Sequence, residues 1–244
     1  MSRSYAFITT AVLLIGTATA FAQAPAPAAR GGRQGAGAPA GARAGGPARR
    51  PALLFKEEWK QNEKGDEHAA TQESVANPNL ELKLYGQSHE VELTGKANDE
   101  NNPIHVWTGL CTSPCAVALR DKTNMADLTG LARIKWNTKM SGFHEVRPIV
   151  KLADGTWLVG NHTSGTTTDW IVDEFNLSDV KWLKLDITRL VTTGNYVNNV
   201  DLSKVDEIGF VDLMPSSGHG PGGWSDVAQI EVYGKAVPRT GATQ

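Results

Sequence analysis

Four histidines that lie among polar residues are the first candidates for chemistry in this 244-residue chain: His105, His144, His162 and His219. Their spacing matches no metal-binding pattern such as HExxH, and the chain has neither a GxSxG nucleophile elbow nor a phosphate-binding P-loop. Taken singly, each histidine fits a structural or surface role better than a catalytic one. The sequence therefore predicts no metal site, and a reactive site would have to be assembled from dispersed residues.

Charged residues alternate with apolar ones along two stretches that have the pattern of strands. In ARIKWNTKM, Arg133 and Lys135 share one face, and in FHEVRPIVK, Glu145, Arg147 and Lys151 share one face. Successive side chains of a strand point to opposite sides of a sheet, so each stretch has one polar and one largely apolar face. An antiparallel sandwich with a wet outer surface would give the same alternation without any ligand.

A ligand-binding polar face is the functional interpretation of this pattern. Arginine and carboxylate side chains can bind sugar hydroxyls, and tryptophan rings can stack on sugar C–H faces. The residues expected to bind the ligand are His105, Trp107, Arg133, Lys135, Lys151, Trp157, His162, Asp212 and Trp224. Ionisable groups crowded together could also perform acid–base chemistry, and the candidates are His144, Glu145, Arg147 and His219.

The chain has seven tryptophans, which we divide by their surroundings. Trp136 and Trp182 lie in strongly patterned strands and are predicted to be in the core. Those next to turns or polar clusters are candidates either for a binding platform or for the core: Trp107, Trp157, Trp170 and Trp224.

A glycine-rich loop, SSGHGPGG, separates the last two strongly patterned strands. Its glycines relax the backbone, so the loop can fold back over a sheet. We expect His219 and Trp224 to form a rim over the polar face, within reach of Arg133 and Arg147.

Short runs of β-branched and aromatic residues, separated by turn residues, recur from residue 51 to residue 240. We predict strands at 52–56, 80–85, 89–94, 104–108, 115–120, 131–139, 144–152, 156–160, 169–175, 181–187, 207–213 and 226–233. Helical periodicity is scarce. The pattern predicts an all-β domain, a two-sheet antiparallel β-sandwich of the jelly-roll type.

The last part of this domain resembles the galactose-binding-domain-like jelly rolls. The matching residues before the glycine loop are Asp201, Leu202, Ser203, Val205, Ile208, Gly209 and Phe210, and those after it are Asp226, Ile230, Val232 and Tyr233. Asp226 lies four residues before Ile230 rather than two, so the second match is looser. The resemblance implies a fold found in carbohydrate-binding modules and lectin-like domains, but a fold does not fix a function.

The first 50 residues are expected to lie outside this domain. Residues 1–22 have the charged start, apolar run and small-residue cleavage pattern of a signal peptide, which predicts a secreted or periplasmic protein. Residues 23–50 consist mainly of Ala, Gly, Pro and Arg and are predicted to be a disordered linker. No other segment is apolar enough to span a membrane. Without Arg3 and the five linker arginines, residues 51–244 have a net charge of −8, which argues against nucleic-acid binding.

Two further features could hold the domain together. Cys111 and Cys115 in CTSPC are expected to form a disulfide in an oxidising compartment, although free thiols or a metal pair with His105 are alternatives. The segment KANDENNP has oxygen-rich side chains from Asn98 to Asn101, which fit either a structural Ca²⁺ or a polar turn. No cofactor is expected to be required.

Three functions remain open on these grounds. The first is a carbohydrate-binding β-sandwich protein that recognises a sugar or glycoside. The second is a single-domain lyase or hydrolase that acts on a sugar or glycoside by His/Lys/Glu acid–base chemistry. The third is an envelope adhesion or structural protein. The sequence predicts no oligomeric state.

Overall fold

The computed structural model describes residues 50–86, 90–220 and 222–239. The predicted signal peptide and almost all of the predicted linker therefore lie outside the described residues. No helix in the described ranges is long and apolar enough to cross a membrane.

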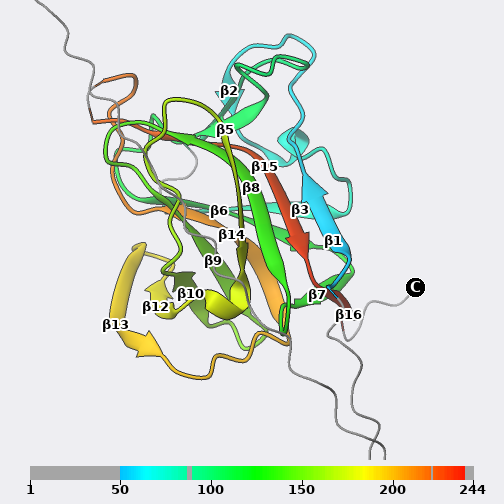
Figure 1. The fold of residues 1–244 in the computed structure, drawn as a ribbon. Helices are drawn as coiled ribbons and strands as arrows, with labels where there is room; N and C mark the ends of the chain where they lie inside the picture. Colours follow the sequence, from blue (N-terminus) through cyan, green and yellow to red (C-terminus); the bar gives the residue numbers. More distant parts are fainter. Residues whose placement is uncertain (1–49, 87–89, 221, 240–244) are drawn as a thin grey trace, which may run out of the picture. The chain divides into compact units, whose positions relative to one another are not determined.

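The described residues form two sheets, and β15 lies at the centre of the first. Its strands, in order of hydrogen bonding, are β11 (Ile171–Asn176), β8 (Arg133–Met140), β15 (Ser225–Tyr233), β5 (His105–Trp107), β4 (Glu92–Thr94) and β2 (His68–Ala69). β8 pairs along the whole of β15, so β5 and β1 (Leu53–Glu57) share the other edge of that strand. Figure 1 shows β15 in red between β8 in green and β1 in blue.

The second sheet packs against the first. In order, it contains β13 (Val191–Val197), β12 (Trp182–Asp186), β10 (Trp157–Gly160), β9 (Val146–Leu152), β14 (Val205–Asp212), β6 (Cys115–Asp121) and β3 (Leu80–Gly86). β7 (Asn124–Asp127) joins β14 and pairs with β16 (Lys235–Pro238). All the pairings are antiparallel, which confirms the predicted two-sheet β-sandwich.

Every predicted strand has a counterpart within a few residues, and the part of the 89–94 prediction at His89 lies outside the described residues. The strands that the sequence did not predict are β2, β7, β13 and β16. β2 has only two residues, and β13 is exposed along almost its whole length, so neither has the half-buried alternation that identifies a strand.

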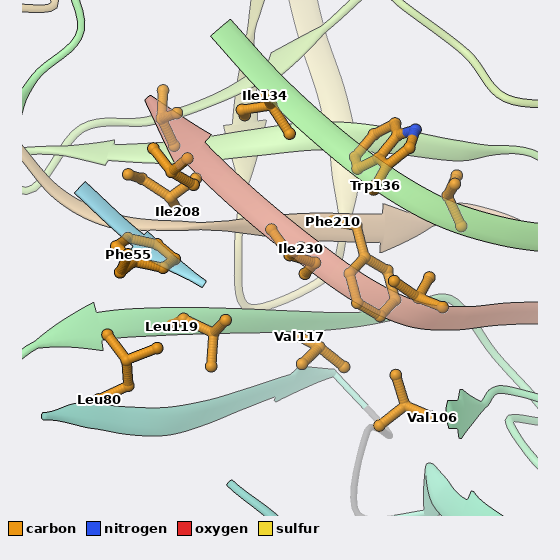
Figure 2. Close-up of a cluster of buried hydrophobic side chains, with 14 of the residues drawn as sticks. Phe55, Leu80, Val106, Val117, Leu119, Ile134, Trp136, Ile208, Phe210 and Ile230 are labelled. Carbon is orange, nitrogen blue, oxygen red and sulfur yellow. The ribbon is translucent and has the colours of Figure 1, made fainter. Parts of the chain in front are cut away.

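The core lies between the two sheets. Along β8, buried and half-buried residues alternate strictly, and the inward positions include Ile134 and Trp136. They belong to the same buried cluster as Phe210 of β14, and Figure 2 shows these side chains. Trp182 is also buried in this cluster, so the prediction that Trp136 and Trp182 are core residues is confirmed. Removing a buried aromatic side chain of this kind costs about 3–5 kcal/mol.

A second, smaller apolar cluster covers the outer side of the second sheet. It contains Ile149 and Trp157 from β9 and β10, and Leu190 closes over it from the turn before β13. A side chain at Gly86, which has φ +69°, would collide with Leu190. Much of the outer face of this sheet is therefore apolar and closed.

Cys111 and Cys115 are both buried and are free thiols in the structure. The disulfide that the sequence predicts is thus not formed here. The two thiols interact, and the hydrogen bond with Cys111, together with burial, raises the pKa of Cys115. A raised pKa keeps a thiol protonated and slows its reaction as a nucleophile.

Candidate functional site

A row of polar and aromatic side chains crosses four strands of the first sheet near one end of β8. Pairing places Glu92 of β4 opposite Trp107 of β5, Trp107 opposite Asp226 of β15, and Asp226 opposite Lys139 of β8. The neighbouring residues Val106 and Val227 point into the core. Alternation then directs the row to the outer face of the sheet.

Three residues of this row, Trp107, Asp226 and Lys139, form part of the floor of a pocket of about 200 Å³. The residues from strands are Thr94, His105, Trp107, Lys139 and Asp226, and those from loops are Glu67, Asn101, Asn102, Trp170, His219 and Trp224. We call this the tryptophan pocket. Three of the seven tryptophans therefore meet in one small cavity.

The indole of Trp107 lies between the backbone of one loop and a ring from another. Its ring stacks on His219, with centroids 4.7 Å apart and planes inclined by 19°. A Cβ atom at Gly109 would overlap the indole, so only glycine leaves room for this orientation. His219 in turn meets Trp224 edge to face at 5.4 Å.

The glycine-rich loop is held on two sides, which fixes His219 over the pocket. On one side Gly218 N donates to Gly109 O at 2.8 Å, and on the other Ser141 N donates to Trp224 O at 2.9 Å. Gly142 and Gly223 have φ values of +66° and +92° and lie so close that a side chain on either would collide with the other loop. The glycines thus allow close packing rather than a mobile lid.

Trp170 forms another wall of the pocket. Its Nε1 donates to Asn101 O at 3.2 Å, which joins the loop before β11 to the loop before β5. The indole also meets the His105 ring edge to face at 5.0 Å. Two loops that are distant in sequence therefore close around the floor.

Asp226 is the most perturbed acid of the pocket. Only 5% of its surface is exposed, and burial raises its pKa to about 7, against the opposing effects of the Trp224 hydrogen bond and of Lys139. Oδ2 accepts from Trp224 Nε1 at 3.2 Å, whereas Oδ1 has no hydrogen-bond partner among the described residues. This carboxyl therefore keeps its proton to a higher pH than an ordinary aspartate, and in its protonated form it can donate as well as accept a hydrogen bond.

His105 is the nearest base to Asp226, with Nε2 3.5 Å from Asp226 Oδ1. Its Nδ1 lies 2.7 Å from Pro103 O and must donate, because a carbonyl only accepts. Burial lowers the pKa of His105, so the ring is neutral and its Nε2 is left as an acceptor. The pocket floor thus holds two ionisable groups side by side: a neutral imidazole and a carboxyl whose pKa burial raises to about 7.

Two more polar groups of the floor have no partner. Trp107 Nε1 is buried and forms no hydrogen bond within the described ranges. The side chain of Lys139 forms no hydrogen bond or ion pair with any residue that the structure describes, although its charge acts on both Asp226 and His105. Buried polar atoms are rarely left without partners, so Trp107 Nε1 and Asp226 Oδ1 have unused hydrogen-bonding capacity.

Comparisons with known proteins concern the fold. The sequence matches no protein-family model and no curated protein. A family 11 carbohydrate-binding module from Clostridium thermocellum, solved with a β-1,3-1,4-mixed-linked tetrasaccharide, is 15% identical, with a TM-score of 0.41 over 69% of this chain and 95% of that chain. The module TmCBM61, solved with β-1,4-galactotriose, is 12% identical, with a TM-score of 0.37 over 63% and 88%. The Emp47p carbohydrate recognition domain is 9% identical, with a TM-score of 0.38 over 78% and 99%.

The structure brings together four of the residues that the sequence analysis singled out for a site. His105, Trp107, His219 and Trp224 all line the tryptophan pocket. His219 and Trp224 do lie together, but they line a pocket with Asp226 and Lys139 and not the expected face of Arg133 and Arg147.

The predicted mixed-charge floor is wrong, because its members lie on different sheets. Arg133 and Lys135 do share the outer face of β8 with Lys139, but Arg133 is at the opposite end of that strand. Each of these two cations already has an acidic partner. Arg133 Nε lies 3.0 Å from Glu174 Oε1, and Lys135 Nζ lies 3.4 Å from Glu231 Oε2.

Arg147, Lys151 and Trp157 belong to β9 and β10 of the second sheet, so they cannot share a face with Arg133. Lys151 Nζ donates to Glu207 at 2.7 Å, and Arg147 Nε donates to Gly160 O at 2.8 Å. Trp157 packs in the smaller apolar cluster. These side chains hold the second sheet together.

His144 and Asp212 are inside the sandwich rather than on a ligand face, since both are fully buried. His144 Nδ1 lies 2.7 Å from Asp212 Oδ2, which also accepts from Ser225 Oγ at 2.7 Å and from Thr108 Oγ1 at 3.3 Å. Asp212 is on β14 and Ser225 on β15, so this network joins the two sheets. The alternation along β14 already indicated it, because Asp212 shares its face with the core residue Phe210.

Glu145 and His162 are also outside the pocket. Glu145 is exposed on the loop before β9. His162 stacks on Phe175 at 3.8 Å and lies 2.7 Å from Asp173 Oδ2, which also accepts from Ser164 Oγ. These contacts form a separate polar network around the indole N–H of Trp136.

Sequence reasoning left several members of the pocket out of the proposed site. Trp170 was a candidate for a binding platform or for the core but was not among the residues expected to bind the ligand. Asp226 was noted only for its match to the jelly rolls, and Lys139 was not a candidate. Asn101 was assigned to a possible Ca²⁺ site, but in the structure Asp99 Oδ1 accepts from Asn101 N at 3.0 Å and organises a turn. The described residues contain no group of three or more His, Cys, Asp or Glu side chains that could hold a metal. A structural Ca²⁺ stays a prediction.

A larger cavity of about 620 Å³ lies near the start of β8, lined among others by Leu177, Trp182 and Tyr196. None of the buried side-chain nitrogen or oxygen atoms that lack a partner among the described residues lines it. The unpaired atoms of Trp107 and Asp226 lie in the smaller pocket, which is why we assign the site there.

Proposed function

We propose that this chain is a carbohydrate-binding protein and that it binds its sugar in the tryptophan pocket. The observation that carries the proposal is the meeting of Trp107, Trp170 and Trp224 around a floor of unpaired polar groups. Indole faces stack on the C–H faces of a sugar ring, and hydroxyl groups both donate and accept hydrogen bonds.

The polar groups of the floor match the two requirements of a hydroxyl group. Asp226 Oδ1 and His105 Nε2 can accept from it, while Lys139 Nζ and Trp107 Nε1 can donate to it. These atoms come from adjacent strands of one sheet, which holds them rigidly before the ligand arrives. Preorganised groups lose little entropy on binding, which favours affinity.

Intrinsic tryptophan fluorescence and calorimetry test this proposal with a panel of monosaccharides and oligosaccharides. The panel includes a mixed-linked β-1,3-1,4-glucan tetrasaccharide and β-1,4-galactotriose. Trp170→Ala and Trp224→Ala are each expected to weaken binding by about 3- to 10-fold, because each removes one stacking surface.

Tyr196→Ala is the matched control, since Tyr196 is an exposed aromatic in the larger cavity. It should bind sugar as the unchanged chain does. If Tyr196→Ala weakens binding and the two tryptophan variants do not, the site has been assigned to the wrong cavity. If no sugar of the panel binds, carbohydrate recognition itself is wrong.

A second function, acid–base chemistry on a bound sugar, is favoured by one observation. Asp226 has a pKa near 7 and lies at the floor of the same pocket, beside neutral His105. An acid with a pKa near the working pH is suited to proton transfer. Product formation from the panel, absent in Asp226→Asn although that variant still binds, would support a lyase or hydrolase. A panel that is bound but unchanged would leave binding as the function.

We also propose that the protein acts outside the cytoplasm. The support is the export pattern of residues 1–22 and the composition of residues 23–50. Fractionation of cells that express the full chain should find it in the periplasm or the medium, shortened at its N-terminus. Recovery of the full-length chain in the cytoplasm would contradict this.

A further inference from the structure

We infer that the tryptophan pocket takes a single sugar unit at the end of a glycan chain and does not hold the middle of a chain. This inference rests on the proposed function and goes beyond it, because it names which part of a glycan is recognised. It follows from the size of the pocket, from the contacts that wall it on two sides and from the orientation of its aromatic rings.

The pocket is small. Its volume of about 200 Å³ is below the roughly 300–1,000 Å³ of sites that enclose a drug-sized ligand. A pocket of this size has room for one sugar ring, and further rings of the chain must lie outside it.

Contacts between loops wall the pocket on two sides. On the side of His105, Trp170 Nε1 is bonded to Asn101 O, so the loop before β11 meets the loop before β5. On the side of Trp107, the anchored glycine loop places His219 on the indole. A chain that passed through the site would have to enter and leave between these walls, whereas a chain end has to enter only once.

The orientation of the aromatic rings agrees with a pocket rather than a strip. The His105–Trp170 and His219–Trp224 pairs meet edge to face, at interplanar angles of 64° and 77°. A row of consecutive sugar units needs aromatic faces that are presented side by side in one surface. Here the planes of the paired rings are steeply inclined to one another, and the rings surround a common floor.

Counting binding sites per mass of polymer tests the inference. Mixed-linkage β-1,3-1,4-glucan and β-1,4-galactan are each titrated intact and after partial acid hydrolysis to about one tenth of the chain length, at equal mass. Recognition of a chain end predicts about ten times more binding sites per mass after hydrolysis, and competition by the corresponding free monosaccharide.

Two outcomes overturn the inference in different ways. A constant number of sites per mass, with no competition by monosaccharide, means that internal segments are bound, and only the chain-end inference fails. An absence of binding to the polymers, their fragments and every monosaccharide overturns the proposed function together with this inference.

A pair of variants tests the role of the wall. Trp170→Ala opens the wall between the two loops, whereas Trp170→Phe keeps an aromatic ring in place. The alanine variant should lose most of the preference for hydrolysed over intact polymer, and the phenylalanine variant should retain it. Equal preference in both variants would show that this wall does not select the chain end.

Discussion

At the scale of single residues, Asp226 is the side chain whose environment departs most from the ordinary. Its carboxyl is buried opposite Lys139 but forms no ion pair with it in the structure, and instead lies beside Trp224 and His105. A buried acid without a charged partner is expected to keep its proton. Asp226 should therefore destabilise the fold where it is forced to ionise, as functional acids often do.

The effect of Asp226 on stability has a definite dependence on pH. Between about pH 4 and pH 7 the unfolded chain has released this proton while the folded chain still holds it, because the folded pKa is about 7. Stability should therefore fall as the pH rises through this window, by about 4 kcal/mol at most, and level off above it. Asp226→Asn removes this loss, so the variant should gain stability relative to the unchanged chain at pH 8 but not at pH 4.

Urea unfolding at pH 4 and pH 8 measures this difference, with Asp201→Asn as the control. Hydrogen bonds from Ser203 lower the pKa of Asp201, so its ionised form is favoured by folding and the pH effect should have the opposite sign. If Asp226→Asn has the same effect on stability at both pH values, Asp226 is ionised in the folded protein at neutral pH.

At the scale of elements, short loops and strand ends position the rings of the pocket. β5 has only three residues, and Gly109 follows it where the indole of Trp107 folds back over the backbone. The sequence shows this glycine, but the reason for it appears only when the ring position is known.

Gly109→Ala tests this arrangement. The new methyl group would occupy the place of the Trp107 ring, so the ring must turn away from His219. We expect sugar binding to weaken by about 10-fold or more, and stability to fall by about 1–3 kcal/mol, the usual cost of overpacking. Calorimetry and urea unfolding measure the two effects.

Gly165→Ala is the matched control, because a Cβ there would meet only Glu145 at an ordinary contact distance of 3.9 Å. It should leave both binding and stability close to those of the unchanged chain. Unchanged sugar binding in Gly109→Ala would remove Trp107 from the site.

At the scale of the whole molecule, the buried network around Asp212 joins the two sheets. It connects β14 to the start of β15 and includes His144, which the sequence analysis had assigned to catalysis. Its members are fully buried, so the network is structural and is separate from the tryptophan pocket.

Asp212→Ala should therefore destabilise the fold by about 3–5 kcal/mol, because it leaves His144 and Ser225 without their shared acceptor. Glu145→Ala is the control, since that side chain is exposed and its loss should change stability by no more than about 0.5 kcal/mol. Urea unfolding distinguishes the two. If both variants are similarly stable and Asp212→Ala has lost sugar binding, then Asp212 binds the ligand, as the sequence analysis expected.

The fold class and most strand positions could be predicted from the sequence alone. So could the division of β8 into a core face with Trp136 and an outer face with Lys139, because alternation depends only on the local chain. The pairing of β8 with β15 could not, since these strands are far apart in the sequence. β13 was not predicted, because a strand at the exposed edge of a sheet lacks the alternation of apolar and polar residues that identifies a strand.

The sequence by itself determined which side chains share a face of one strand, and it named both His105 and Trp107 as residues expected to bind the ligand. Only the tertiary structure decided which strands lie side by side. β8 and β9 follow one another in the chain, yet they belong to different sheets, so Arg133 and Arg147 are separated while His105, Trp170 and Asp226 meet. The physical reason is that alternation is set by the backbone of each strand, whereas the partners of a strand are set by long-range packing of the whole core.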